Sequence, residues 1–120
     1  PYSYCDPDDA NTETASSPAG CATMAETAMV AEAGETRYSS LTPFDNVNDY
    51  HGFSMAGIAD LTGAPVAGLG GYSAAVQVQP AGAFNGILAG ETLLVTVTVS
   101  GPGNHSVSLS GYRTRYAPNI

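Results

Sequence analysis

Two stretches in the second half of the chain alternate between apolar side chains and side chains that are mostly polar. In residues 93–100 the odd positions hold Leu or Val, and the even positions hold Thr, Ser and one Leu. In residues 72–79 the even positions hold Tyr, Ala and Val, and the odd positions hold Ser, Ala and Gln. A period of two is typical of strands with one buried face. The chain should therefore form an antiparallel sheet with an apolar face that must be covered.

The residues after these strands predict how the sheet continues. Gly101–Asn104 supplies a turn, and a third strand begins near Val107. The large side chains of Tyr112 and Tyr116 fall on the opposite parity from Val107. We therefore expect the alternation to slip at a β-bulge at Ser110–Gly111.

The rest of the chain carries weaker signals. Residues 52–55 indicate a further short strand, and residues 80–91 are expected to form a long loop. Residues 1–22 are rich in turn formers and predict an irregular loop. Thr23-Met24-Ala25-Glu26 fits a helix capping box, and Gly34 fits a C-terminal cap, which together predict a short helix over Thr23–Ala33.

The predicted fold class is α+β, with about four antiparallel strands and a segregated helix in a single domain over residues 1–120. Residues 1–35 would form a disulfide-stapled loop and the short helix, and residues 36–120 a loop and the sheet. The large core-forming residues Val, Leu, Ile and Phe are sparse, and the chain has no Trp. The predicted helix is too short and too rich in Ala to cover four strands, so we expect the covering material to lie outside these residues.

The two cysteines, Cys5 and Cys21, flank a polar segment. An even count in a small Gly- and Ser-rich chain predicts one disulfide and an oxidising compartment. A metal site is a poor alternative, because only His51 and His105 could complete it and neither has ligand spacing.

The charge and the motifs exclude several functions. Eleven acidic residues face three Arg and no Lys, and a net charge of -8 disfavours binding to nucleic acid or to anionic membrane surfaces. No stretch approaches the roughly 18 apolar residues of a membrane span, so we expect no membrane contact from this segment. No Gly-x-Ser-x-Gly elbow occurs, and Gly68–Gly71 precedes a strand rather than a helix. The sequence predicts neither an enzyme nor a cofactor.

Two acidic segments invite a calcium interpretation. Asp6–Asn11 offers alternating carboxylates but departs from the EF-hand pattern at its last two positions, Ala10 and Asn11. A solvated acidic turn is the preferred interpretation. Asp45, Asn48 and Asp49 form a second possible oxygen cluster, for which backbone capping within a loop is preferred. No metal site is predicted.

The segment Phe44–Gly52, FDNVNDYHG, resembles the FDDVDDYNG element of type IV minor pilins of the MshD and PilV kind. It departs from that element at Asn46, Asn48 and His51. The resemblance implies an ordered structural loop between helix and sheet. Its residues would be Phe44, Asp45, Asn48, Asp49 and Tyr50.

Two further segments share the resemblance, the closing residues Leu109–Pro118 and the opening residues Pro1–Asp9 with Cys5. The family fold implies a long N-terminal helix packed on a four-stranded antiparallel sheet. The function implied is that of a structural subunit, a minor pilin or pseudopilin, of an extracellular filament reached through the periplasm. Its partners would be other pilin subunits.

The covering helix is thus expected to lie outside these 120 residues, either as the protein's own N-terminal helix or as a separate helix-only pilin chain. The alternative function is a free-standing extracellular β-rich binding or adhesin module.

Overall fold

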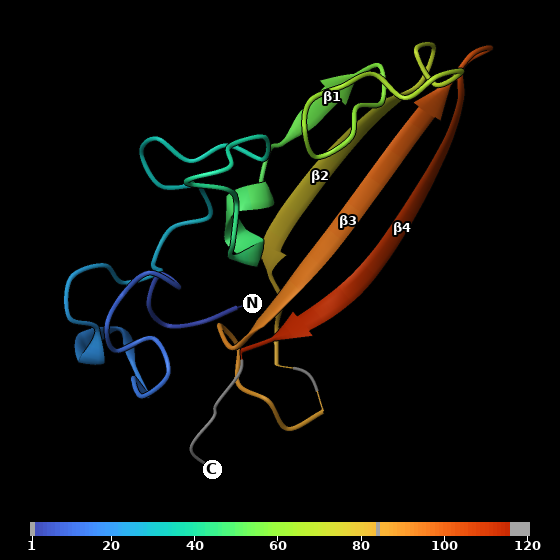
Figure 1. Ribbon diagram of the computed structural model, residues 1–120. Coiled ribbons are helices and arrows are strands. Elements are labelled where there is room, and N and C mark those ends of the chain that lie inside the picture. The colour runs from blue at the N-terminus through green and yellow to red at the C-terminus, as the bar shows by residue number, and fades with distance from the viewer. Residues whose placement is uncertain (1, 84, 116–120) are drawn as a thin grey trace.

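The computed structural model describes residues 2–83 and 85–115. It contains a four-stranded antiparallel sheet in the order β1-β2-β3-β4, formed by β1 (Ser54–Ala56), β2 (Ser73–Pro80), β3 (Thr92–Gly101) and β4 (His105–Thr114) (Figure 1). The predicted antiparallel sheet and the loop between β2 and β3 are confirmed. None of the helices in the described ranges has the length and apolarity that a membrane crossing requires.

The strand register places the apolar stripes on one face. Val97 in β3 lies opposite Val76 in β2 and Leu109 in β4, and successive side chains of a strand point to opposite faces. The reverse face is polar, and there hydroxyl pairs join β3 to β4: Thr96 to Ser110 at 2.8 Å and Thr98 to Ser108 at 2.7 Å. The sheet therefore has one apolar and one polar face.

The predicted bulge at Ser110–Gly111 is wrong. Pairing between β3 and β4 runs without interruption from Gly101 opposite His105 to Thr92 opposite Thr114. Tyr112 is accommodated because it lies opposite Leu94, on the polar face, so no change of parity is needed. Tyr116 lies outside the described residues.

The predicted helix over Thr23–Ala33 is also wrong. The two helical segments in the described ranges are single 3-10 turns, η1 (Pro18–Gly20) and η2 (Val47–Tyr50). The backbone N–H groups of Ala22, Thr23 and Met24 instead donate to the Asp9 carboxylate, at 2.6–3.0 Å. The N–H of Thr23 thus donates to Asp9 rather than to the Glu26 carboxylate, and the N–H of Glu26 donates to the carbonyl of Tyr4 rather than to the Thr23 hydroxyl, so neither hydrogen bond of the capping box forms.

The segment after Met24 runs extended beside the first residues of the chain. Ala25 forms an antiparallel bridge with Cys5, and the N–H of Glu26 donates to the carbonyl of Tyr4 at 2.7 Å. The Cys5–Cys21 disulfide closes this region, with a Cα–Cα separation of 5.4 Å in the usual range. The predicted disulfide is thus present, in an irregular rather than a helical setting.

The buried core is small and lies at one end of the sheet. Tyr2, Val78 and Leu93 are its fully buried members. Partly buried side chains around them complete the cluster: Met29, Val47, Tyr50, Val76 and Val95. Arg115 fixes the first residues of the chain to this end of the sheet, since its guanidinium lies 4.0 Å from the ring centre of Tyr2 and donates to the Tyr2 hydroxyl at 2.8 Å.

Candidate functional site

The loop Phe44–Gly52 is organised by its own side chains. The Asp49 carboxylate accepts from the N–H groups of Asp45, at 3.0 Å, and Asn46, at 2.7 Å, where η2 begins. The Phe44 and Tyr50 rings pack edge to face, 5.1 Å apart. Two of the residues singled out in the sequence, Phe44 and Tyr50, therefore pack together, while Asp49 caps the turn between them.

The same loop joins the sheet to the N-terminal segment. On one side, the imidazole Nδ1 of His51 accepts from the N–H of Val78 at 3.1 Å, and Gly52 and Phe53 bond to the backbone of Val76. These contacts continue the edge of β2 beyond the short strand β1. On the other side, the Asn48 amide donates to the Glu26 carboxylate and, at 3.1 Å, to the carbonyl of Ala28.

The two acidic residues of the loop should respond differently to substitution. Asp49→Ala leaves two N–H groups without their acceptor and should lower the free energy of unfolding by about 1–3 kcal/mol. Asp45 uses its N–H as a donor, while its buried carboxylate oxygen Oδ1 has no hydrogen-bond partner. Asp45→Ala is the matched control and should cause no loss. Urea unfolding at neutral pH measures both, and equal losses would contradict this assignment.

Six carboxylates gather where this loop meets the N-terminal segment. Glu26 and Glu32 come from the segment that the sequence predicted to be helical, and Glu35 follows it. They join the two acidic segments identified separately in the sequence. The group is Asp6, Glu26, Glu32, Glu35, Asp45 and Asp49. The three glutamates were missed because Glu26 and Glu32 lay within the predicted helix, Glu35 followed its Gly34 cap, and no periodicity marks them. The one available signal was the excess of acidic residues in a chain without Lys.

Burial and the neighbouring negative charges disfavour the ionised forms of Asp6, Glu26, Glu35, Asp45 and Asp49. Burial is the main cause that raises the pKa of Glu26 to about 8, and the adjacent Glu32 raises it further. Burial together with the Asp49 charge raises the pKa of Glu35 to about 7, and burial raises the pKa of Asp45 to about 6. The pKa values of Asp6 and Asp49 are also raised, mainly by burial. The folded chain therefore holds protons that the unfolded chain releases.

Stability in a chelating buffer should consequently fall as the pH rises from about 5 to about 8. In that interval the folded state binds more protons than the unfolded state, so the derivative of the unfolding free energy with pH is negative. Urea unfolding across this range measures the slope, and Glu26→Gln should flatten it. A stability that is constant or rises with pH would contradict the raised pKa values.

The apolar face of the sheet is covered at one end and open at the other. Val78 and Leu93 are fully buried by the N-terminal segment and η2. The exposed fraction is larger for residues farther along the sheet from Val78 and Leu93: it is 38% at Val99, 66% at Val107 and 74% at Leu109. We call the exposed part, formed by Tyr72, Val97, Val99, Val107 and Leu109, the open half of the apolar face.

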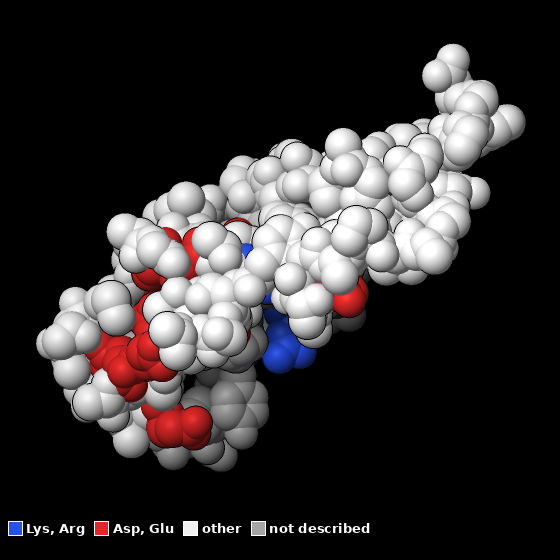
Figure 2. Space-filling view, turned by 45° about the horizontal axis from the view of Figure 1, so that its top comes forward, with Lys and Arg blue, Asp and Glu red and all other residues white. Residues whose placement is uncertain are grey.

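A shallow hollow of about 230 Å³ lies at the end of this open half. Tyr72, Val99, Pro102, His105 and Val107 contribute to its lining. Residues 61–90 and 92–112 contain no Asp, Glu, Lys or Arg. On the face shown in Figure 2, acidic side chains gather at one end of the molecule, and the other end carries none. The open half is thus an uncharged apolar surface, separate from the acidic cluster.

Comparison with known protein families, with curated proteins and with solved structures finds no significant match.

Proposed function

We propose that this chain is a structural subunit of an extracellular filament of the type IV pilus class, a minor pilin or pseudopilin. It would act by packing and surface contact rather than by catalysis. The observation that carries the proposal is the open half of the apolar face, which has the composition of a core surface and lies exposed to solvent.

The energetic argument concerns large apolar side chains left in water. Fully burying a Val or Leu side chain contributes roughly 1.5–3 kcal/mol, and Val107 and Leu109 retain 66% and 74% of their exposure. Several such residues lie side by side in register across β3 and β4. A contiguous apolar patch of this kind marks an interaction site.

A helix is the occupant that fits this face. In α+β domains, helices cover the apolar face of an antiparallel sheet. Tyr2, the first described residue, already packs on this face against Val78 and Leu93. In the proposal, the protein's own N-terminal helix continues this cover over the open half. A separate helix-only chain would present the same surface.

The disulfide supports the proposed location. A Cys5–Cys21 bridge forms and persists in an oxidising compartment, as expected for a subunit that passes through the periplasm to the cell surface. Its partners in the proposal are other subunits of the filament.

The experiment introduces a charge on each face of the sheet. In the source organism, the deleted gene is complemented with wild type, Leu109→Asp or Gln77→Asp, and each product is measured in sheared extracellular filaments. Gln77 is the matched control, because it is exposed on the polar face. Leu109→Asp should remove the chain from the filament fraction, and Gln77→Asp should leave it there. Equal incorporation of both variants, or a wild-type chain absent from filaments, would overturn the proposal.

A further inference from the structure

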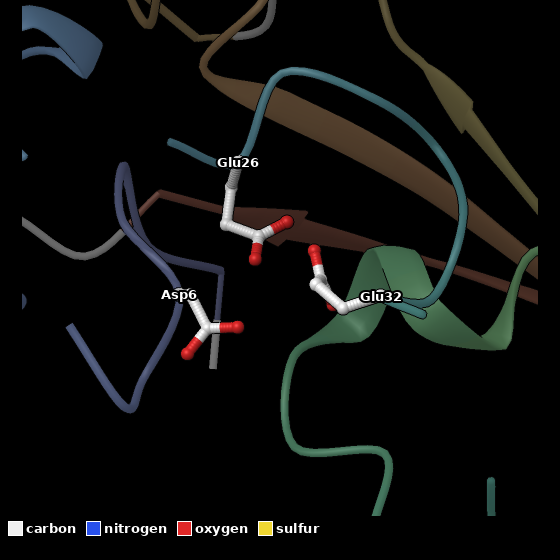
Figure 3. Close-up of side chains that lie close together, drawn as sticks. All are labelled: Asp6, Glu26 and Glu32. Carbon is white, nitrogen blue, oxygen red and sulfur yellow. The ribbon is translucent and has the colours of Figure 1, made fainter. Parts of the chain in front are cut away.

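Three carboxylates from separate parts of the first half of the chain converge on one point. Asp6, Glu26 and Glu32 each place an oxygen within 4.8 Å of the oxygens of the other two. Figure 3 shows the three side chains pointing toward a common space. Glu32 also belongs to a second group of the same tightness, with Glu35 and Asp49. The disulfide loop and the 26–35 segment, joined by the Cys5–Ala25 bridge, thus place acidic side chains against one another.

Asp6 and Glu26 are buried, Glu32 is partly buried, and some of their oxygens lack hydrogen-bond partners. Asp6 is 2% exposed and Glu26 is 4% exposed. Glu26 uses one oxygen to accept from the Asn48 amide, while its other oxygen, Oε1, is buried and has no hydrogen-bond partner. The same is true of Oε2 of Glu32. A buried carboxylate oxygen aimed at other carboxylates is costly unless a cation or a proton lies between them.

Among the described residues, no ion pair joins an arginine to Asp6, Glu26 or Glu32. The chain has no Lys and three Arg. Within residues 2–83 and 85–115, the Arg115 guanidinium pairs with Glu91 at 3.1 Å, and Arg37 donates to the carbonyl of Asp60 at 3.0 Å. Neither contact reaches the cluster, and Arg113 lines a hollow with Asp45 and Tyr50 without an ion pair to Asp6, Glu26 or Glu32.

We propose that this cluster binds a calcium ion, with Asp6, Glu26 and Glu32 as its carboxylate ligands. Calcium takes six to eight oxygen ligands at about 2.3–2.6 Å, so ligand oxygens around one ion lie within about 5 Å of one another. The separations here satisfy that limit. The ligand set consists of oxygen alone, because both cysteines are in the disulfide, and several carboxylates in irregular loops suit calcium better than magnesium or zinc.

The neighbouring groups fit this assignment. The amide of Asn48, 1% exposed, lies against Glu26 and leaves its oxygen Oδ1 without a hydrogen-bond partner. A bound ion would tie the disulfide loop to the 26–35 segment, and Glu35 and Asp49 would extend the negative field around it. The inference concerns stability and does not rest on the proposed filament function.

The competing arrangement is a shared proton. If Glu26 and Glu32 hold one proton between them, the repulsion is relieved without an ion, and calcium would add nothing. The two arrangements differ in one measurable respect. A calcium site gives a saturable response to added calcium, and a shared proton gives none.

The test is calorimetric titration of CaCl2 into the chelator-treated 120-residue chain, with thermal midpoints in calcium and in KCl of equal ionic strength. One calcium ion should bind with a Kd of about 1 mM or tighter, the range of extracellular calcium modules. The thermal midpoint should rise in calcium, rise less in magnesium and stay unchanged in KCl. Absence of both the binding heat and the midpoint shift at about ten times that concentration would overturn the proposal.

Matched variants distinguish direct coordination of calcium from a nonspecific effect of the chain's negative charge. Glu26→Gln keeps the side-chain shape and should weaken calcium binding about tenfold or more, since affinity follows the charge of the ligands. Asp8→Asn makes the same charge change at an exposed position outside the cluster and should leave the Kd within about twofold. Glu32→Gln is the second ligand variant if Glu26→Gln does not fold. Equal weakening by a ligand variant and by Asp8→Asn would show screening and overturn the site.

Discussion

Leu93→Ala should lower the free energy of unfolding of the 120-residue chain by about 2–5 kcal/mol. Leu93 is fully buried and packs with Tyr2 and Val78 in the small core. The core has few large members, so the cavity left by three missing carbon atoms has little around it that can close in. This substitution should be among the most damaging single changes in the chain.

Leu109→Ala is the matched control, since it makes the same chemical change on the same face of the sheet. Leu109 is 74% exposed, so its truncation in the isolated chain should change the unfolding free energy by less than about 0.5 kcal/mol. Urea unfolding of the two variants beside wild type provides the comparison. Similar losses would mean that β4 is already covered within these residues, and the open half would not exist.

Removal of the Cys5–Cys21 bridge should cost about 3 kcal/mol, the chain-entropy estimate for a loop of this size. The two cysteines are 16 residues apart, and the segment between them has no regular structure apart from η1. The bridge confines a region that has little apolar contact of its own. A small domain with a thin core depends on such a crosslink.

The measurement compares urea unfolding of the oxidised protein with that of the Cys5→Ala, Cys21→Ala double variant, which avoids reductant and free thiols. A loss well below about 1 kcal/mol would mean that hydrogen bonds to the Asp9 carboxylate hold the region without help from the disulfide. Asp9 accepts from the backbone of residues 11, 22, 23 and 24, and these bonds lower its pKa. They are present in both proteins, so the comparison isolates the bridge.

The sheet was predictable because its signals are local. Alternation in residues 93–100 determines which side chains share a face, and the turn after Gly101 determines that the next strand returns beside it. Gly103 and Asn104 adopt positive φ in that turn, as glycine and asparagine readily do. The bulge prediction failed at Tyr112, because the sequence cannot distinguish an exposed tyrosine on the polar face from a strand whose alternation has shifted by one residue.

The N-terminal half could not be predicted because distant side chains decide its structure. The capping box at Thr23–Glu26 is a valid local helix signal, but Asp9 accepts hydrogen bonds from the backbone there, and Glu26 turns inward to meet Asn48. The acidic cluster depends on the same long-range contacts. Asp6 and Glu26 become neighbours through the Cys5–Ala25 bridge, a pairing that no short motif encodes.

The central claim is that the open half of the apolar face is a surface for a helix. Its most direct test compares thermal midpoints, in one buffer, of residues 1–120 and of a longer chain that also carries the proposed N-terminal helix. The longer chain should melt at least about 4 °C higher, the shift expected from 1 kcal/mol in a domain of this size. Leu109→Asp should abolish that gain while leaving the midpoint of the shorter chain unchanged. Equal midpoints for the two chains, or a gain that survives Leu109→Asp, would contradict the claim.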